Sequence, residues 1–121
     1  MKIGSPIPIL RSFDEKKAKE FYVGFLDFRV DWEHRFDETA PLYMQISKGE
    51  CVIHVSEHHG DCSPGAALRI EVDEIEAFKA VLNKKAYQNA RPGITEQPWG
   101  KDMSISDPFG NKVIFCELSG D

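Results

Sequence analysis

The chain has 121 residues, of which 41% are hydrophobic and 29% are charged. These proportions are ordinary for one folded domain, and a chain of this length buries about two thirds of its extended surface without needing disulfide bonds. The net charge of -5 argues against nucleic-acid binding, which requires a basic surface that neutralises phosphates. It modestly favours neutral or cationic ligands.

The sequence contains no sign of membrane insertion, secretion or a disulfide framework. No apolar run approaches the roughly 20 residues of a membrane span, and the first residues lack the apolar core of a signal peptide, so we expect a cytoplasmic protein. Cys51, Cys62 and Cys116 are an odd number without Cys-x-x-Cys spacing. They fit reduced thiols better than disulfides or a zinc site, and Cys51 and Cys116 fall in apolar strand patterns.

The first half of the chain predicts one strand, one helix and three further strands. An apolar strand is expected over residues 6–10, and Ser12 followed by Glu15 has the spacing of a capping box. A helical apolar stripe follows, formed by Ala18, Phe21, Tyr22, Phe25 and Leu26. Strands are then expected over residues 28–34, 42–47 and 52–55, the last two joined by a turn at 48–50.

The second half repeats this order. A strand is expected over residues 67–72, Asp73 and Glu76 repeat the capping spacing, and the helical stripe consists of Ile75, Phe78 and Leu82. A weaker strand near 94–97 precedes strands at 103–106 and 113–116. The last two are joined by Asp-Pro-Phe-Gly-Asn at 107–111, whose aspartate, proline and glycine suit a type I turn.

The two halves are therefore copies of one βαβββ unit, and we expect a single α+β domain with modules over residues 1–60 and 65–121. The run Met44-Gln-Ile-Ser occupies the same place in the first copy as Met103-Ser-Ile-Ser in the second. One helix covers only one face of such a small sheet. The opposite face must meet the other module, a second chain or a ligand, so we expect function there.

Five short motifs are spread along nearly the whole chain, namely Ile7-Pro8-Ile9-Leu10, Glu20-Phe21-Tyr22, Leu26-Asp27-Phe28, Glu96-Gln97-Pro98-Trp99-Gly100 and Asp107-Pro108-Phe109-Gly110-Asn111. Together they resemble the bleomycin-resistance proteins, a branch of the glyoxalase or vicinal-oxygen-chelate superfamily. The resemblance implies two βαβββ modules forming a cup-shaped mixed sheet, and a homodimer with ligand clefts at its interface. It also implies an N-terminal strand that is exchanged between chains and contains Pro8, although a proline equally suits an unexchanged edge strand.

Enzymes of this superfamily bind a divalent metal through His and Glu on the inner strands. The resemblance places those positions at Ile7, Ile53, Ile114 and either Ala66 or Ala67. None of these side chains can coordinate a cation. We therefore expect no metal at the inherited site and no other cofactor.

A second group of potential metal ligands consists of His54, Glu57, His58, His59 and Asp61. The segment is typical of a strand followed by a loop, and spacing alone is weak evidence for a metal site. Loop histidines are most often solvated, but this link borders the cleft in the resembled family. We expect Glu57, His58 and His59 to contact a ligand at the cleft rim, and an unorthodox metal site is the alternative.

Trp32, Phe36, Trp99 and Phe109 are the aromatic candidates for ligand binding. In the resembled family, aromatic side chains at places matching Trp32 and Trp99 flank the flat part of the drug, and Phe36 lies near another such place. Aromatic faces stack on planar groups and attract cations. Trp32 fits a core position equally well, whereas Trp99 falls on an expected loop, between a proline and a glycine, which favours a binding role. Phe109 is a further candidate because the turn exposes it.

The sequence thus predicts a small-molecule binding protein that sequesters a planar or cationic glycopeptide-type ligand without catalysis. Acidic residues around Trp32 favour a cation, although a solvated edge strand has the same composition and Arg69 would favour an anion. No pair of residues forms a persuasive acid–base or nucleophile–base arrangement. The alternatives are a metal-dependent lyase, isomerase or dioxygenase, and a binder of a different metabolite.

Overall fold

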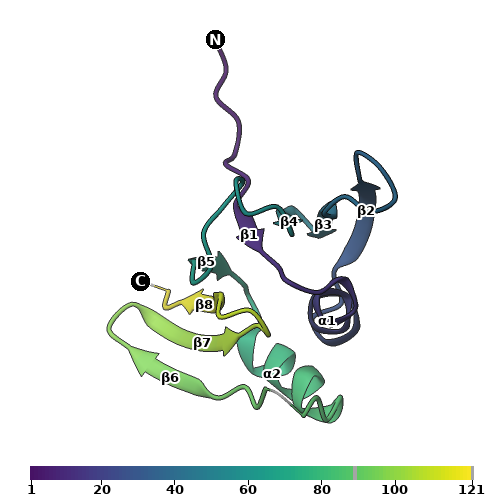
Figure 1. Ribbon diagram of the computed structural model, residues 1–121. Coiled ribbons are helices and arrows are strands. Elements are labelled where there is room, and N and C mark those ends of the chain that lie inside the picture. Colours follow the sequence, from purple (N-terminus) through teal and green to yellow (C-terminus); the bar gives the residue numbers. More distant parts are fainter. Residues whose placement is uncertain (89, 121) are drawn as a thin grey trace.

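The computed structural model describes residues 1–88 and 90–120, which form two four-stranded sheets and two helices (Figure 1). The strand orders, β1-β4-β3-β2 and β5-β8-β7-β6, are the same in the two halves. In each sheet the first strand runs parallel to the fourth, and the remaining pairs are antiparallel. The predicted α+β fold with a repeated βαβββ unit is confirmed.

Every predicted element is present in the described residues. The first module contains β1 (Ile9–Arg11), α1 (Glu15–Lys19) with its π-helical continuation η1 (Glu20–Phe25), β2 (Arg29–His34), β3 (Tyr43–Lys48) and β4 (Cys51–Ser56). The second contains β5 (Ala67–Glu71), α2 (Ile75–Lys84), β6 (Ile94–Gln97), β7 (Gly100–Ser106) and β8 (Lys112–Leu118). The strand expected over residues 6–10 starts only at Ile9, and the preceding segment extends away from the rest of the molecule (Figure 1).

The predicted capping box at the start of α1 is wrong. The N-cap residue is Asp14, whose Oδ1 accepts a hydrogen bond from the Lys17 backbone N–H at 2.9 Å. Ser12 Oγ instead accepts from the Asp14 N–H at 3.3 Å. Ser12 therefore shapes the loop before the helix, and the cap lies two residues later than its spacing to Glu15 predicts.

The helix α2 also begins without the predicted side-chain cap. Its N-cap residue is Glu74 rather than Asp73, and the Glu74 side chain makes no capping hydrogen bond. The Ile75 backbone N–H donates instead to Glu117 Oε1 of β8 at 2.9 Å. A carboxylate from a neighbouring strand thus satisfies the helix N-terminus, which local sequence spacing could not reveal.

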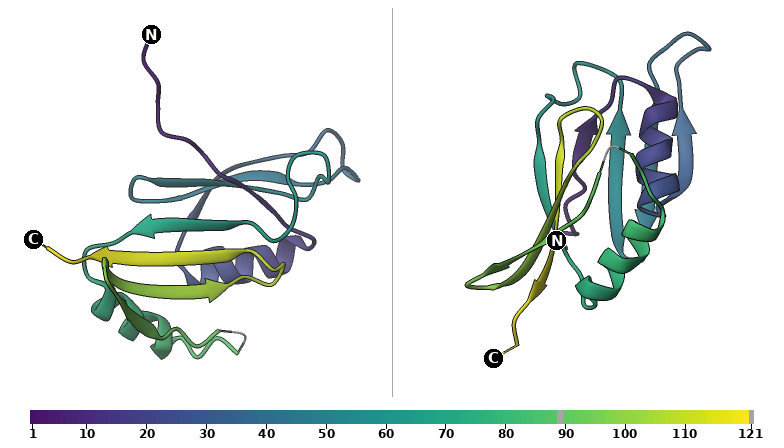
Figure 2. Two further views of the ribbon diagram at one scale, coloured as in Figure 1. Left: turned by 90° about the vertical axis from the view of Figure 1, so that its left-hand side faces the viewer. Right: turned by 90° about the horizontal axis from the view of Figure 1, so that it is seen from below.

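Both helices lie against one shared core, with α1 beneath β2 and α2 beside β7 and β8 (Figures 1 and 2). The predicted stripe of the first helix is buried, and the rings of Phe21 and Phe25 lie 6.0 and 4.8 Å from that of Tyr87 in the second module. Side chains alternate along β3, where Met44 and Ile46 are fully buried. Each sheet therefore turns one face to the core and leaves its outer face uncovered by this chain.

The turn between β7 and β8 joins the two modules. Asp107 accepts hydrogen bonds from Tyr22 Oη (2.5 Å), the Phe109 N–H (2.9 Å), and the backbone and side-chain nitrogens of Asn111 (both 2.8 Å). The Asn111 side chain also donates to the Arg11 carbonyl at 2.8 Å. The predicted turn is confirmed, and it also links the first helix and β1 to the second sheet.

Among the described residues, no helix has the length and apolar character needed to cross a membrane.

Candidate functional site

The outer face of the first sheet carries a cluster of rings. The indole of Trp32 is 43% exposed and lies parallel to the Tyr43 ring, with centroids 6.0 Å apart and an interplanar angle of 8°. The His54 ring meets Trp32 edge-on at 5.3 Å. Between the equally plausible core and surface positions for Trp32, the structure places this tryptophan on the surface.

A bulge in β2 explains how this face is built. The pairing of β2 with β3 shifts between Val30 and Trp32, so Asp31 is an extra residue without its own partner. A bulge re-aims side chains that would otherwise alternate. Asp31 contacts Gln45 and Trp32 stacks on Tyr43, so two consecutive residues of β2 both reach the outer face.

A chain of hydrogen bonds connects the polar groups of this face. Gln45 Nε2 lies 3.1 Å from Asp31 Oδ2, His54 Nε2 lies 3.0 Å from Gln45 Oε1, and Tyr43 Oη lies 2.6 Å from His54 Nδ1. Burial lowers the pKa of His54. The pKa of Tyr43 is raised, first by burial and then by the negative charge of Asp61. The sequence did not point to Tyr43 and Gln45, because strand alternation gives no sign that both side chains form hydrogen bonds with His54 on the neighbouring strand.

A cavity of about 260 Å³ adjoins the ring cluster and is lined by His34, Phe36, Pro41, Tyr43, His58 and Asp61. It brings together two predicted ligand contacts, Phe36 and His58. Phe36 is 90% exposed and its ring meets that of His34 edge-on at 4.9 Å. Asp61 is held in place because its Oδ2 accepts a hydrogen bond from Ser56 Oγ at 2.6 Å.

The outer face of the second sheet carries Trp99, which is 45% exposed. Its Nε1 donates to Asp102 Oδ1 at 3.0 Å, and the Arg69 guanidinium donates to the same oxygen at 2.8 Å while lying 5.4 Å from the centroid of the Trp99 ring. Burial acts to raise the pKa of Asp102, but hydrogen bonds from Trp99 and the pairing with Arg69 hold this pKa below its usual value. These three residues form a fixed triad beside a cavity of about 450 Å³.

The backbone around Gly100 fixes where Trp99 lies. Gly100 has a φ of 147°, and a Cβ atom at this position would lie 2.1 Å from the Glu117 carbonyl oxygen of β8. Only glycine allows this close approach. The Ser119 N–H also donates to the Trp99 carbonyl at 2.9 Å. Trp99 therefore lies in the predicted connection before β7, but on a rigid turn between β6 and β7 rather than on a long loop.

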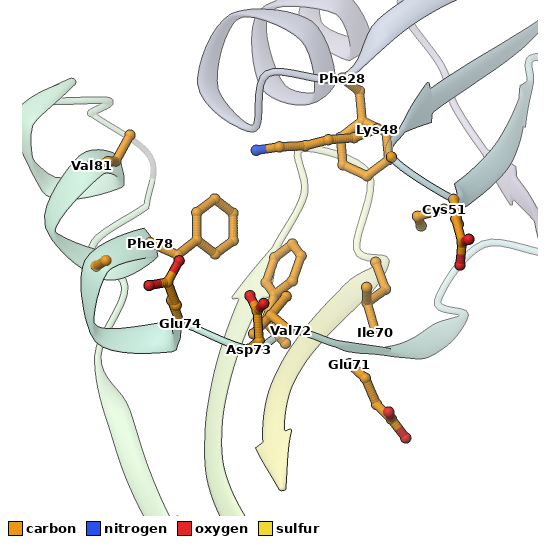
Figure 3. Close-up of a pocket in the computed structure, with 14 residues that line it drawn as sticks. Phe28, Lys48, Cys51, Ile70, Glu71, Val72, Asp73, Glu74, Phe78 and Val81 are labelled. Atoms are coloured by element: carbon orange, nitrogen blue, oxygen red, sulfur yellow. The ribbon is translucent and has the colours of Figure 1, made fainter.

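A larger cavity, of about 670 Å³, lies between the β3–β4 turn and α2 (Figure 3). Its apolar lining includes Phe28, Ile70 and Phe78, and the Lys48 side chain crosses it (Figure 3). Lys48 Nζ donates to the Leu26 carbonyl at 3.0 Å and lies 4.7 Å from the Phe78 ring centroid, and burial lowers the pKa of Lys48. The Lys48 ammonium group therefore already has partners within the protein, and none of the predicted ligand contacts lines this cavity.

Comparison with known proteins connects these observations to a family. The family model described as "Glyoxalase superfamily protein" matches residues 2–121. The chain belongs to the glyoxalase superfamily. A search of curated protein sequences found no match.

Solved structures support the same fold for this superfamily member. TnmS3, an antibiotic binding protein from Streptomyces sp. CB03234, is 20% identical, with 98% of this chain and 99% of that chain covered and a TM-score of 0.74. The bleomycin-binding protein from Streptomyces verticillus, complexed with copper(II)-bleomycin, is 23% identical, with the same coverage and a TM-score of 0.72. A glyoxalase family protein from Enterococcus faecalis is 20% identical, with coverages of 92% and 94% and a TM-score of 0.68.

The strand register corrects one position of the superfamily's inherited metal site. Ile46 pairs with Ile53 in the first sheet and Ile105 pairs with Val113 in the second, so the repeat counterpart of Ile114 is His54 rather than Ile53. Ile53 is fully buried in the core. His54 is a potential ligand, but its two ring nitrogens already face a tyrosine and a glutamine. The described residues contain no group of three or more His, Cys, Asp or Glu side chains that could hold a metal ion.

The remaining predicted contacts lie in different places. Glu57 Oε1 accepts a hydrogen bond from the Leu42 N–H at 2.9 Å, so its carboxylate holds the end of the loop before β3. His59 stacks on His58 with ring centroids 5.2 Å apart. Phe109 packs edge-on against Phe13 at 6.1 Å. It lies in the turn after β7, at the opposite end of this strand from Trp99.

Proposed function

We propose that this protein is a small-molecule binding protein that sequesters a planar, cationic ligand without chemical conversion. The observation that carries the proposal is the placement of Trp32 and Trp99, two exposed indoles on the outer faces of different sheets. Large exposed rings that are held rigidly are typical of binding surfaces, because they stack on planar groups and attract cations. The net charge of -5 further favours a cationic ligand.

In our proposal the cleft is formed by two chains. The two sheets turn their inner faces to a shared core, so the outer faces point in different directions (Figure 1). A two-fold dimer that sets the first sheet of one chain against the second sheet of its partner creates two equal clefts. Each cleft then contains Trp32 from one chain and Trp99 from the other, two indoles that can stack on a flat ring system.

The comparisons support a drug-like ligand for this site. One protein of the same fold is described as an antibiotic binding protein, and another was solved with copper(II)-bleomycin. The polar groups beside the rings also favour binding over catalysis. Asp31, Gln45 and His54 are engaged with one another, and Asp102 is shared by Arg69 and Trp99. A metal-dependent superfamily enzyme is the competing proposal.

The decisive test is calorimetric titration with bleomycin, with and without copper, combined with measurement of the molecular mass in solution. We expect a dimer that binds one ligand per chain, and we expect Trp32→Ala and Trp99→Ala each to abolish tight binding. Phe13→Ala is the matched control, since it removes an exposed ring outside the proposed cleft. A monomer without bleomycin binding would contradict the proposal, and stoichiometric metal whose removal abolishes turnover of a small substrate would favour the enzyme.

Mixing the two tryptophan variants tests whether both chains contribute to one cleft. A heterodimer of Trp32→Ala and Trp99→Ala chains has one cleft with both tryptophans and one cleft with neither. We therefore expect the mixture to recover tight binding in proportion to the heterodimer formed. If each cleft belonged to one chain, mixing would recover nothing, and the proposed arrangement would be wrong.

A further inference from the structure

The hydrogen-bond chain on the first sheet has a fixed direction. An ionised carboxylate can only accept, so Asp31 orients the Gln45 amide with Nε2 toward Asp31 and Oε1 toward His54. Gln45 Oε1 can only accept as well, so His54 carries its proton on Nε2. The unprotonated Nδ1 of His54 then accepts the hydroxyl proton of Tyr43 across 2.6 Å.

This direction determines what Tyr43 offers to a ligand. Its only proton is given to His54, so the free lone pairs of Oη act as acceptors toward the cavity of about 260 Å³ that Tyr43 lines with Asp61 and Phe36. Asp61 adds an acceptor-only group to the same cavity, and its Oδ2 already accepts from Ser56 Oγ. The cavity thus combines an exposed aromatic ring with two acceptors, Tyr43 Oη and the Asp61 carboxylate, beside the rings of His34 and His58.

We propose that this cavity is a subsite for an N–H group at the edge of a planar ring, with Tyr43 Oη as the acceptor that selects it. The inference rests on the proposed function, because it describes the ligand of the same outer face. Tyr43 suits this role because its ring is stacked against Trp32 at an interplanar angle of 8°. The stacking surface and the acceptor are thereby held in one fixed geometry, with Asp31, Gln45 and His54 acting as positioning residues.

The same geometry makes the selection reversible with pH. When His54 takes up a second proton, its Nδ1 becomes a donor to Tyr43 Oη, and the Tyr43 hydroxyl must turn its own proton toward the cavity. The subsite then offers a donor and selects an acceptor atom. Burial lowers the pKa of His54, so its neutral form prevails at neutral pH. The titratable groups around this pair are Asp31, reached through Gln45, and Asp61 and Cys62, which act on Tyr43. His34 and His58 line the same cavity, and His58 Nδ1 lies 3.7 Å from Asp61 Oδ1.

The first measurement uses the free wild-type protein and no ligand. Nitrogen-15 NMR of the imidazole side chains at about pH 8, well above the ordinary pKa of histidine, should show His54 with a protonated Nε2 and a bare Nδ1. A protonated Nδ1 at this pH would overturn the inference. Because no variant is involved, this result does not depend on whether a mutant folds.

The second measurement compares two fragments by NMR titration at millimolar concentration. Indazole carries a ring N–H, 1-methylindazole lacks it, and neither fragment titrates between about pH 5 and pH 8, the range in which histidine changes its charge. At about pH 8 we expect the wild-type protein to bind indazole about three to ten times more tightly, the range expected for one hydrogen bond. At lower pH, once His54 is protonated, the preference should disappear, because both fragments carry the ring nitrogen N2 as an acceptor.

Tyr43→Phe is the matched variant, since it removes Oη and keeps the ring stacked on Trp32. We expect this variant to bind both fragments equally at both pH values. A preference that survives in Tyr43→Phe would show that the methyl group acts sterically, and would overturn the inference, as would fragments that leave the Tyr43 signals unmoved. Failure of bleomycin to bind, with the fragment preference intact, would instead refute the drug proposal alone.

Discussion

The β7–β8 turn gives the sharpest test of how the two modules are held together. We expect Asp107→Ala to destabilise the protein strongly, because it removes one acceptor shared by four donors. Three of them belong to the fully buried residues Tyr22 and Asn111. The Asn111 side-chain nitrogen keeps the Arg11 carbonyl as an acceptor, whereas Tyr22 Oη and the Asn111 backbone N–H are left without a partner. A buried donor without a partner costs about 1–3 kcal/mol. Two such donors therefore lower the free energy of unfolding by about 2–6 kcal/mol, a large part of the 5–15 kcal/mol typical of a domain.

The assay is equilibrium unfolding in urea, followed by fluorescence and circular dichroism, with the midpoint compared at constant slope. Ser106→Ala is the matched control, because it truncates the exposed neighbour and should change stability by less than about 0.5 kcal/mol. Tyr22→Phe removes only one donor and should cost less than Asp107→Ala. If Asp107→Ala lowered stability by no more than Ser106→Ala, the turn would not join the modules, and the reasoning would be refuted.

Three further predictions concern the site. Gly100→Ala should displace Trp99 and lower stability, seen as a changed tryptophan spectrum and urea midpoint, while Gly93→Ala, where a Cβ meets nothing within 4 Å, should change neither. Asp102→Ala should leave the fold intact but weaken bleomycin binding, because the Trp99 indole loses its hydrogen bond; unchanged affinity would contradict this role. The pKa of His54 is lower in the folded protein than its ordinary value of 6.5, so at pH values between the two the unfolded chain binds more protons. The free energy of unfolding should therefore fall as the pH is lowered below about 6.5. His54→Gln should flatten this decline, and a decline of the same slope in the variant would show that another group causes it.

The fold was predictable because its signals are local. Alternating and helical apolar patterns depend only on spacing along the chain, so even the weak strand near 94–97 matches β6 (Ile94–Gln97). The turn at 107–111 was predictable for the same reason, since its residues favour the turn by their own conformational preferences. The two helix caps were not predictable. Asp14 and Ser12 are both suitable N-cap residues and lie only two positions apart, and the start of α2 is capped by Glu117 from the distant strand β8.

The site was predictable only in part. The exposure of Trp99 followed from its position between Pro98 and Gly100, but its fixed orientation depends on contacts in the folded sheet. Asp102 lies three residues further on, in β7, and Arg69 lies on β5, two strands from β7. The bulge at Asp31 has no local signal, and it decides which side chains of β2 reach the outer face. Carrying the metal-ligand positions of the resembled family over to this chain also misassigned the repeat counterpart of Ile114. Contacts between strands, rather than residue types, create the hydrogen-bond chain.

The extended N-terminal segment bears on the proposed dimer. Ile3 and Ile7 are exposed on a segment that leaves the molecule before β1 (Figure 1), and apolar side chains on such a segment gain free energy only by burial. The same chain leaves the outer faces of both sheets without cover. A second copy of the chain would bury the N-terminal segment and cover the outer faces at the same time. In a two-fold dimer the segment of each chain lies on the sheets of its partner. Exchange of the N-terminal strand therefore remains our proposal, and the same symmetry would bring Trp32 and Trp99 of different chains into one cleft.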